Sequence, residues 1–334
     1  MTATNHVQAT GQMASRRGVL ERIGNRVGVH NISLIAALII LCVIFGSLRG
    51  DVFFSSRNIL NIGLAVTILG VLAMSQTVVI VAGGLDVAVG STVGLSTVAT
   101  AMAVQVTGSA AVGVIAGFAV GAACGVVNGI IITYGRVNAV IATLGTMAIF
   151  RGVAFILSDG QSISIFDEQF RFMGNGTMLG LPVPLWILAV TAVAFQIFLS
   201  QSIAGRNVYA IGGNPVVARF SGINVNRYKV AIYTMSGFIG GLGGILLAAR
   251  TGSGQPISGS QGLELEAITV AVLGGCALQG GRGTIVGALL GVLIIGVLNN
   301  GMILTAVPTF YQLLAKGALL ILAVLVAEYR LNRT

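Results

Sequence analysis

Long apolar runs separated by short polar links constrain this chain more than any other feature. Charged residues make up only 8% of the chain, against about 25% in soluble domains. An α-helix needs about 20 predominantly apolar residues to cross a bilayer. Ten runs approach or reach that length, at about 31–48, 58–82, 87–106, 109–134, 138–158, 183–200, 228–250, 264–279, 283–303 and 308–327. We therefore expect an all-α, polytopic membrane protein with about ten transmembrane helices.

Two of the ten runs are weaker than the rest. Run 264–279 is short and ends in a glycine interruption, whereas run 87–106 contains several serines and threonines, Ser91 and Ser96 among them. Each of these two runs is therefore a candidate for a broken or re-entrant helix.

Basic residues concentrate in alternate links between the runs, as is typical of cytoplasmic loops. With the N-terminus inside, twelve basic residues fall on the cytoplasmic side and four fall outside. The inside set is Arg16, Arg17, Arg22, Arg26, Arg136, Arg206, Arg219, Arg227, Lys229, Arg282, Arg330 and Arg333; the outside set is Arg49, Arg57, Arg171 and Arg250. This asymmetry predicts an even number of spans with both termini in the cytoplasm.

The charge pattern divides the chain into three parts. We expect a cytoplasmic tail over 1–30, a transmembrane domain over 31–327 and a second cytoplasmic tail over 328–334. No small-residue cleavage site follows the first apolar run, so we expect that run to remain as an uncleaved span.

The longest basic polar island among the apolar runs, 201–229, carries a signature for a short capped helix. Asn214 suits the N-cap and Pro215 the first helical position, while Gly222 suits the left-handed position that ends a helix after Ser221. The island is basic and contains no acidic residue. A short helix on a cytoplasmic loop is typical of a surface that contacts a soluble partner.

Glycine spacing indicates close helix packing and an internal duplication. Gly113, Gly117, Gly121, Gly125 and Gly129 recur at every fourth position, which leaves a flat face for another helix. Intramolecular packing is the simpler explanation, and a subunit interface is the alternative. Segment 83–94 resembles 274–287, and 125–129 echoes 296–301. These similarities predict a possible inverted repeat of spans 2–5 and 7–10.

The sequence contains no catalytic or metal-binding pattern. The two histidines, His6 and His30, lie in the N-terminal tail, and the three cysteines have no metal-ligand spacing. Neither lysine fits the phosphate-binding loop G-x-x-x-x-G-K-[ST]. We therefore expect no metal, no cofactor bound by this chain, no enzymatic activity and no hydrolysis of ATP by that loop. The net charge of +9 is explained by arginine in cytoplasmic loops, and we expect no nucleic-acid partner.

Polar residues at membrane depth are candidates for function, because burying them in lipid is costly. Asp86 follows two glycines and is either the N-cap of the third span or a gate residue. Candidates for a translocation path are Asp86, Ser91, Asn128, Asn299, Asn300 and Gln312. Uncharged amides suit a neutral polyol better than an ion, although hydrogen bonds between helices are an equal alternative.

Charged residues in or beside the spans have their own alternatives. For Arg151 and Lys316, snorkelling or pairing with a carboxylate is the simpler interpretation. Glu264 and Glu266 open the eighth run at the outer face. They either complement the helix dipole or contact an extracellular partner.

Several motifs in consistent order resemble one protein family. They are GGLDVAVGS at 83–91, ATLGTMAIFRG at 142–152, GRNVYAIGGNPVVARFSGINV at 205–225, LELEAITVAVLGGCALQGGRGTIVG at 263–287 and LNNGMIL at 298–304. Together they resemble the ribose-type permeases of ATP-binding-cassette sugar importers, from about residue 50 to 327. Two departures are Pro215, where those permeases often carry Glu, and Cys276-Ala277 in place of small hydroxyl residues.

The resemblance implies a multi-pass permease of the bacterial inner membrane that works as a pair, either a homodimer or two related chains. It implies a periplasmic sugar-binding protein outside and a cytoplasmic sugar-type ATPase inside, with ATP and Mg bound by that ATPase. Membrane lipid surrounds the assembly. The residues that the resemblance assigns to the ATPase-coupling loop are Arg206, Asn214, Pro215, Ala218, Arg219, Gly222 and Ile223.

The function we expect is import of a small neutral carbohydrate: a pentose, a hexose or a polyol. The alternatives are an ion-coupled secondary transporter with inverted repeats, which would need acidic residues in mid-membrane, and a membrane scaffold that transports nothing. Asp86 is the nearest candidate for such an acid.

Overall fold

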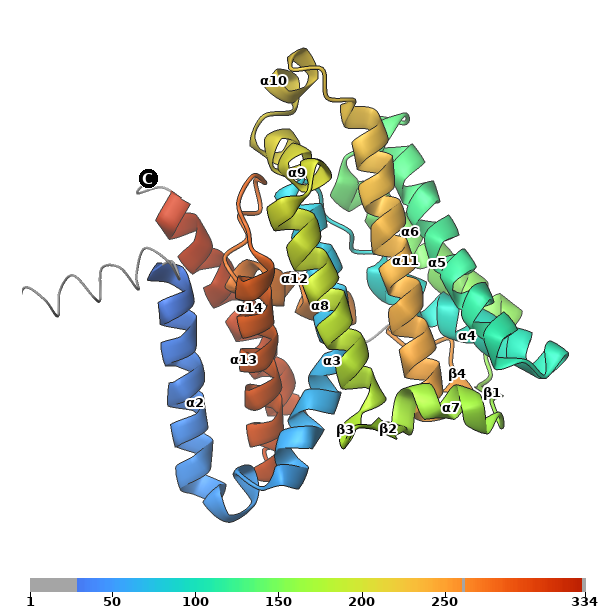
Figure 1. Ribbon diagram of the computed structural model, residues 1–334, viewed down its shortest axis with the longest axis vertical. Helices are drawn as coiled ribbons and strands as arrows, with labels where there is room; N and C mark the ends of the chain where they lie inside the picture. The colour runs from blue at the N-terminus through green and yellow to red at the C-terminus, as the bar shows by residue number, and fades with distance from the viewer. Residues whose placement is uncertain (1–28, 260–261, 332–334) are drawn as a thin grey trace, which may run out of the picture.

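A computed structural model describes residues 29–259 and 262–331 of the chain (Figure 1). Nearly all of the predicted N-terminal tail, with its four arginines, lies outside the described residues, as does Arg333 near the C-terminus. The prediction of cytoplasmic tails therefore stays a prediction for those segments.

The described part of the chain is built almost entirely of helices, which confirms the all-α class. Within residues 29–259 and 262–331, eight helices are long and apolar enough to cross a membrane. They are α2 (Val29–Phe53), α3 (Ser56–Val81), α4 (Val89–Thr107), α5 (Ala110–Thr133), α6 (Ala139–Leu157), α8 (Val183–Gln201), α11 (Val225–Thr251) and α13 (Ile285–Leu304). The helix α14 (Thr309–Leu331) has a shorter apolar stretch over Thr309–Leu322.

The two weak apolar runs have different outcomes. Residues 89–107 form one continuous helix, α4, and most of its side chains are buried inside the protein. Run 264–279 is broken: α12 (Leu263–Leu273) has 11 residues and rises only about 16 Å. Gly275, at φ 97°, then turns the chain into a loop. The ten predicted runs thus correspond to nine longer helices and one half-length helix.

The remaining elements lie at the two ends of the bundle (Figure 1). Helices α9 (Ile203–Gly213) and α10 (Pro215–Phe220) form one end. At the opposite end are α7 (Glu168–Asn175) and two small sheets, in which β1 (Ile163–Ser164) pairs with β4 (Ser253–Gly254) and β2 (Thr177–Met178) pairs with β3 (Leu181–Pro182). Helix α2 begins and α14 ends toward the α10 end, as both termini in the cytoplasm require.

The helix contacts support the predicted inverted repeat. Helix α4 packs against α5, α6 and α11, and α12 packs in the same way against α13, α14 and α3. Likewise α5 packs on α11 and α13 packs on α3. Helices α3 and α11 run in opposite directions (Figure 1). The pairs α3/α11, α4/α12, α5/α13 and α6/α14 are therefore equivalent, and they correspond to spans 2–5 and 7–10.

One of the two sequence echoes fits this repeat and the other does not. Segments 125–129 and 296–301 lie on the equivalent helices α5 and α13. Segment 83–94 instead joins α3 to α4, whereas 274–287 joins α12 to α13, so these two loops are not equivalent. They lie against each other: the amide of Gly281 donates a 2.8 Å hydrogen bond to the carbonyl of Val81.

The glycine stripe on α5 packs within the chain. A Cβ at Gly121 would collide with the backbone of Gly237 and Gly241, and one at Gly125 would collide with that of Tyr233, all on α11. Intramolecular packing, the simpler of the two interpretations, thus accounts for the stripe. It brings α5 and α11 into backbone contact.

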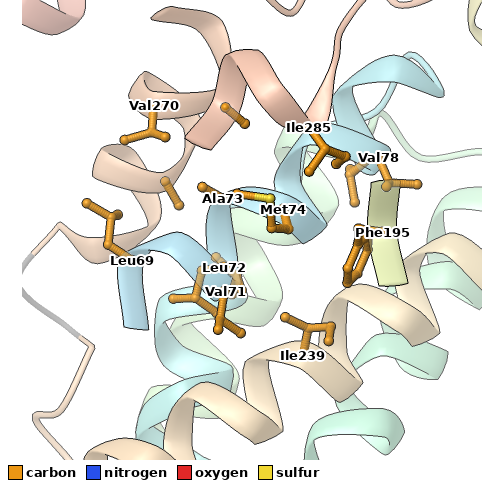
Figure 2. Close-up of a cluster of buried hydrophobic side chains, with 14 of the residues drawn as sticks. Leu69, Val71, Leu72, Ala73, Met74, Val78, Phe195, Ile239, Val270 and Ile285 are labelled. Carbon is orange, nitrogen blue, oxygen red and sulfur yellow. The ribbon is translucent and has the colours of Figure 1, made fainter. Parts of the chain in front are cut away.

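The hydrophobic core centres on α3, whose residues from Val66 to Val81 are all buried. Figure 2 shows Leu72, Met74 and Val78 of this helix surrounded by side chains from four other helices. Those labelled neighbours are Phe195 of α8, Ile239 of α11, Val270 of α12 and Ile285 of α13. Helix α3 is therefore the element through which both halves of the repeat are packed together.

Candidate functional site

The short helix α10 forms as the capping signature predicts. Oδ1 of Asn214 accepts hydrogen bonds from the amides of Val216 at 3.0 Å and Val217 at 3.1 Å. Pro215 is the first helical residue. Gly222 has φ 83°. The amides of Gly222 and Ile223 each donate a 3.1 Å bond to the carbonyls of Arg219 and Ala218, so the helix ends in a Schellman motif.

The outer surface of α10 is apolar and unusually exposed. Val216 is 62% exposed, Val217 58% and Phe220 89%. Arg219 is also exposed, whereas Ala218 is buried and packs with Ile211, Val225 and the half-buried Ile223. Ala218, one of the predicted coupling residues, therefore supports the helix from beneath, and Ile223 packs beside it. The three exposed apolar residues were not predicted as contacts, although valines and a phenylalanine within a basic island indicate a surface that binds a partner.

Helix α9 was not predicted, and it connects α10 to the membrane helices. Its N-cap Ser202 accepts a 2.8 Å bond from the amide of Gly205. Near its other end, a Cβ at Gly212 would collide with the carbonyl of Val81 and would lie 2.6 Å from the amide of Gly281. We call this contact between Val81, Gly212 and Gly281 the glycine junction. It brings α9 against the loop after α3 and the loop after α12.

The remaining coupling residue, Arg206, lies on the exposed side of α9. Its Nη1 donates only to the carbonyl of Gln201, at 3.5 Å. Nearby, Nδ2 of Asn207 donates a 2.7 Å bond to the hydroxyl oxygen of Tyr228, which lies in α11. Helix α9 is thus fixed to α11 while Arg206 stays accessible to a partner.

Asp86 lies in a buried polar cluster. Its carboxylate accepts hydrogen bonds from Oγ of Ser236 at 2.7 Å, from the amide of Ala88 at 3.1 Å and from Nδ2 of Asn128 at 3.5 Å. Its carbonyl accepts a 2.7 Å bond from Nε2 of Gln76. The residue is only 1% exposed. Asp86 therefore holds the α3–α4 loop to α3, α5 and α11.

The N-cap interpretation of Asp86 is wrong. Helix α4 begins after Ala88, and no side chain caps it. The carboxylate bonds the amide of Ala88 itself, two residues along the chain. Ser91 lies one turn into α4, is buried, and donates a 2.8 Å bond to the carbonyl of Ala88. The gate interpretation of Asp86 and Ser91 stays a prediction.

The predicted path residues do not all converge. Asp86, Ser91 and Asn128 lie close together, but Asn300 forms a reciprocal amide pair with Asn58, with bonds of 2.8 and 3.0 Å. Gln312 donates a 2.8 Å bond to the carbonyl of Val307. Asn300 and Gln312 therefore have structural bonds. Among the described residues, the side-chain oxygens of Asn128 and Asn299 are buried without a hydrogen-bond donor, and Asn299 lines a separate cavity.

The structure does not place Glu264 and Glu266 on an exposed outer face. Glu264 is 6% exposed and lies against Gly90 of α4. Oε1 of Glu266 forms a 2.6 Å ion pair with Nζ of Lys316 in α14. A surface contact with an extracellular partner is therefore not available to Glu264. The pairing alternative for Lys316 is confirmed, and its partner is Glu266.

Two cavities accompany these residues. The larger, of about 860 Å³, opens beside α10 and is lined by Arg136, Arg219 and Lys229 together with Pro215 and Gly83. The smaller, of about 450 Å³, lies between α3, α11, α12, α13 and α14. Among the described residues no group of His, Cys, Asp or Glu could hold a metal ion.

Taken together, these features define a polytopic membrane protein with an inverted helical repeat and a rigid, apolar-tipped helix at its cytoplasmic end. Residues 58–324 match the protein family described as "Branched-chain amino acid transport system / permease component". The chain belongs to this family and is a multi-pass protein of the bacterial inner membrane.

Relatives of known function are similar over almost their whole length. The ribose import permease protein of Escherichia coli (strain K12) is 41% identical over 298 residues, covering 88% of this chain and 92% of that protein. The L-arabinose ABC transporter permease protein of Azospirillum brasilense is 38% identical over 322 residues, covering 96% and 92%. The ribose import permease protein of Bacillus subtilis (strain 168) is 39% identical over 324 residues, covering 96% and 97%.

No solved structure matches the chain. The relatives are transport permease subunits, which supports a permease of an ATP-binding-cassette importer over the ion-coupled alternative.

Proposed function

We propose that this chain is the permease subunit of an importer that moves a small neutral carbohydrate into the cytoplasm. The relatives import ribose or L-arabinose, which supports a pentose or a similar sugar as substrate. The observation that carries the coupling part of the proposal is α10, a helix capped at both ends with Val216, Val217 and Phe220 exposed. Exposed apolar groups rimmed by charge mark interaction sites.

The partner proposed at α10 is a cytoplasmic sugar-type ATPase, which binds ATP and Mg and hydrolyses the ATP. This chain lacks a phosphate-binding loop and serves as the transport part. When the ATPase subunits close, they displace α10. Because α10 is capped at both ends and follows α9 after the single residue Asn214, the displacement reaches the glycine junction, where α9 contacts the loops after α3 and α12. Both halves of the repeat then shift as packed bodies.

On the outer side, the proposed partner is a periplasmic sugar-binding protein. The polar outer segment containing α7 and the two small sheets extends over this end of the bundle (Figure 1). Phe166 and Leu179 are 87% and 85% exposed there. Their exposure supports these two residues, in place of Glu264 and Glu266, as the proposed contact.

A second permease copy, either identical or related, completes the proposed assembly. Helices α2, α6 and α14 carry exposed apolar residues, which suit contact with lipid or with this second copy. Neither the identity of the sugar nor the choice between homodimer and heterodimer is needed for the coupling proposal.

Reconstitution tests the proposal. Proteoliposomes containing this chain with its cognate ATPase and binding protein are supplied with radiolabelled D-ribose, L-arabinose, D-xylose and D-glucose. We expect uptake of at least one sugar that requires both internal ATP and the ATPase chain. Uptake that persists when the ATPase is omitted, or uptake that does not depend on ATP, overturns the proposed function.

A further inference from the structure

The smaller cavity has a lining that no assigned role explains. Its volume of about 450 Å³ lies within the 300–1,000 Å³ usual for small-molecule sites. Its walls come from both halves of the repeat: α3 on one side and α11, α12, α13 and α14 on the other. In secondary transporters built from inverted repeats, substrate sites lie at the interface between the repeats.

Part of the cavity wall is non-helical backbone between helices α11 and α12. The segment from Gln255 to Gly259 follows β4 and packs along α4. The amide of Gln255 donates a 3.2 Å hydrogen bond to Oγ1 of Thr97, and the same hydroxyl donates a 3.0 Å bond to the carbonyl of Gln255. A Cβ at Gly94 would collide with the carbonyl of Ser258. In membrane proteins, irregular backbone is tolerated where it is buried in protein or lines a cavity.

One amide in the wall lacks a partner. Oδ1 of Asn299 is buried, and it accepts no hydrogen bond from any residue that the structure describes. Such an oxygen is unfavourable unless something supplies a donor. The neighbouring Asn300, in contrast, is paired on both atoms with Asn58 and does not line the cavity. Of these two adjacent residues, the one whose side-chain oxygen lacks a donor is the one that lines the cavity.

The charges in the wall cancel. Glu266 of α12 and Lys316 of α14 form the 2.6 Å ion pair, and both side chains remain partly accessible, at 23% and 30%. No other charged residue of the part of the chain that the structure describes lines the cavity. The pair offers acceptors and donors but no net charge, which disfavours an ion. Val66, Ile68 and Leu69 of α3 supply an apolar wall.

From this lining we infer that the cavity between α3, α11, α12, α13 and α14 is a binding site for a neutral polyhydroxylated ligand. The Asn299 amide and the Glu266–Lys316 pair contact its hydroxyls, and α3 contacts its C–H face. This inference rests on the proposed function for the ligand class, a sugar in transit. It assigns Glu266 and Lys316 to the transport site, and it explains why Asn299 has no internal partner.

A labelling experiment reads out binding directly. In the complete reconstituted complex, the cysteine of the Ser258→Cys variant is labelled with a small methanethiosulfonate reagent, once with sugar present and once without. The sugar used is one that the wild-type complex takes up from the set D-ribose, L-arabinose, D-xylose and D-glucose. We expect that sugar to slow labelling about threefold or more, because the cavity is occupied. Thr107→Cys, on the exposed end of α4, is the control and should label at the same rate with or without sugar.

Substitutions test the two polar contacts. Asn299→Leu removes the amide, and the double variant Glu266→Met with Lys316→Met removes the pair without leaving an unpaired charge. We expect each to lower the maximal uptake rate by about threefold to tenfold, as the loss of one or two hydrogen bonds predicts. Each should still co-purify with the ATPase. The matched control Asn300→Leu should not abolish the sugar protection of Ser258→Cys.

The outcomes separate the two proposals. If the wild-type complex takes up sugar but that sugar leaves Ser258→Cys labelling unchanged, or if Asn299→Leu transports normally, the binding site is wrong and the proposed function stands. If the wild-type complex takes up none of the four sugars, the proposed function fails and this inference fails with it.

Discussion

Oγ of Ser236 donates a 2.7 Å hydrogen bond to Oδ2 of Asp86, joining the middle of α11 to the loop between α3 and α4. The two residues are 150 positions apart in the sequence. Both are buried, and Oγ of Ser75 on α3 lies within 3.2 Å of Ser236. The bond therefore connects the two equivalent helices of the repeat through the cytoplasmic loop of one of them.

Removing the serine hydroxyl should destabilise the protein. Ser236→Ala takes from the buried carboxylate its shortest hydrogen bond, and bonds to charged groups contribute about 1.5–3 kcal/mol. We expect a loss of that size in the free energy of unfolding, measured by denaturant titration in detergent micelles. Ser200→Ala is the control, because Ser200 is exposed and bonds only to Gln196 of its own helix. Equal stability of the two variants would argue against the cluster.

A methyl group at the glycine junction should disturb the link between α9 and the membrane helices. Gly212→Ala places a Cβ against the carbonyl of Val81 and the amide of Gly281, whereas Gly213 has open space around it. Overpacking of this kind costs about 1–3 kcal/mol. We expect Gly212→Ala to lower the melting temperature and ATP-driven uptake, while Gly213→Ala leaves both near wild type. Matching behaviour of the two variants would exclude the junction as the route of coupling.

The end of α10 should depend on the left-handed conformation at Gly222. A β-branched residue at φ 83° is strained, at about 1–3 kcal/mol, so Gly222→Val should break the Schellman motif and reduce recovery of the ATPase on co-purification. Asparagine tolerates this region, so Gly222→Asn should retain the ATPase. Full recovery with Gly222→Val would mean that the shape of α10 is not needed.

Local signals in the sequence were sufficient to predict α10 and its two caps. Asn214, Pro215 and Gly222 act within a few residues of one another, so caps and turns predict their roles without tertiary information. The apolar runs and the alternation of basic loops likewise predicted the membrane helices and the side on which α10 lies. The short run at 264–279 predicted a weak span, and α12 is indeed half-length.

Contacts between distant segments could not be read from the sequence. The partners of Asp86 lie on α3, α5 and α11, so its position beside a helix start suggested a cap that does not exist. Glu264 and Glu266 begin α12, but the preceding segment carries that start into the interior, where Glu266 meets Lys316 from α14. Asn299 and Asn300 are adjacent and identical in type, and only the packing of α13 separates an open amide from a paired one.

The central claim is that the exposed tip of α10 couples this chain to an ATPase, and ATP-driven uptake by the Phe220→Asp variant tests it most directly. Phe166→Asp is the matched control, since Phe166 is 87% exposed at the outer end and Phe220 is 89% exposed on α10. Losing one buried aromatic contact weakens binding by about tenfold or more. We predict that Phe220→Asp loses ATPase binding and uptake together while its melting temperature is unchanged, and that Phe166→Asp keeps ATPase binding. Wild-type ATPase binding and uptake by Phe220→Asp would contradict the account.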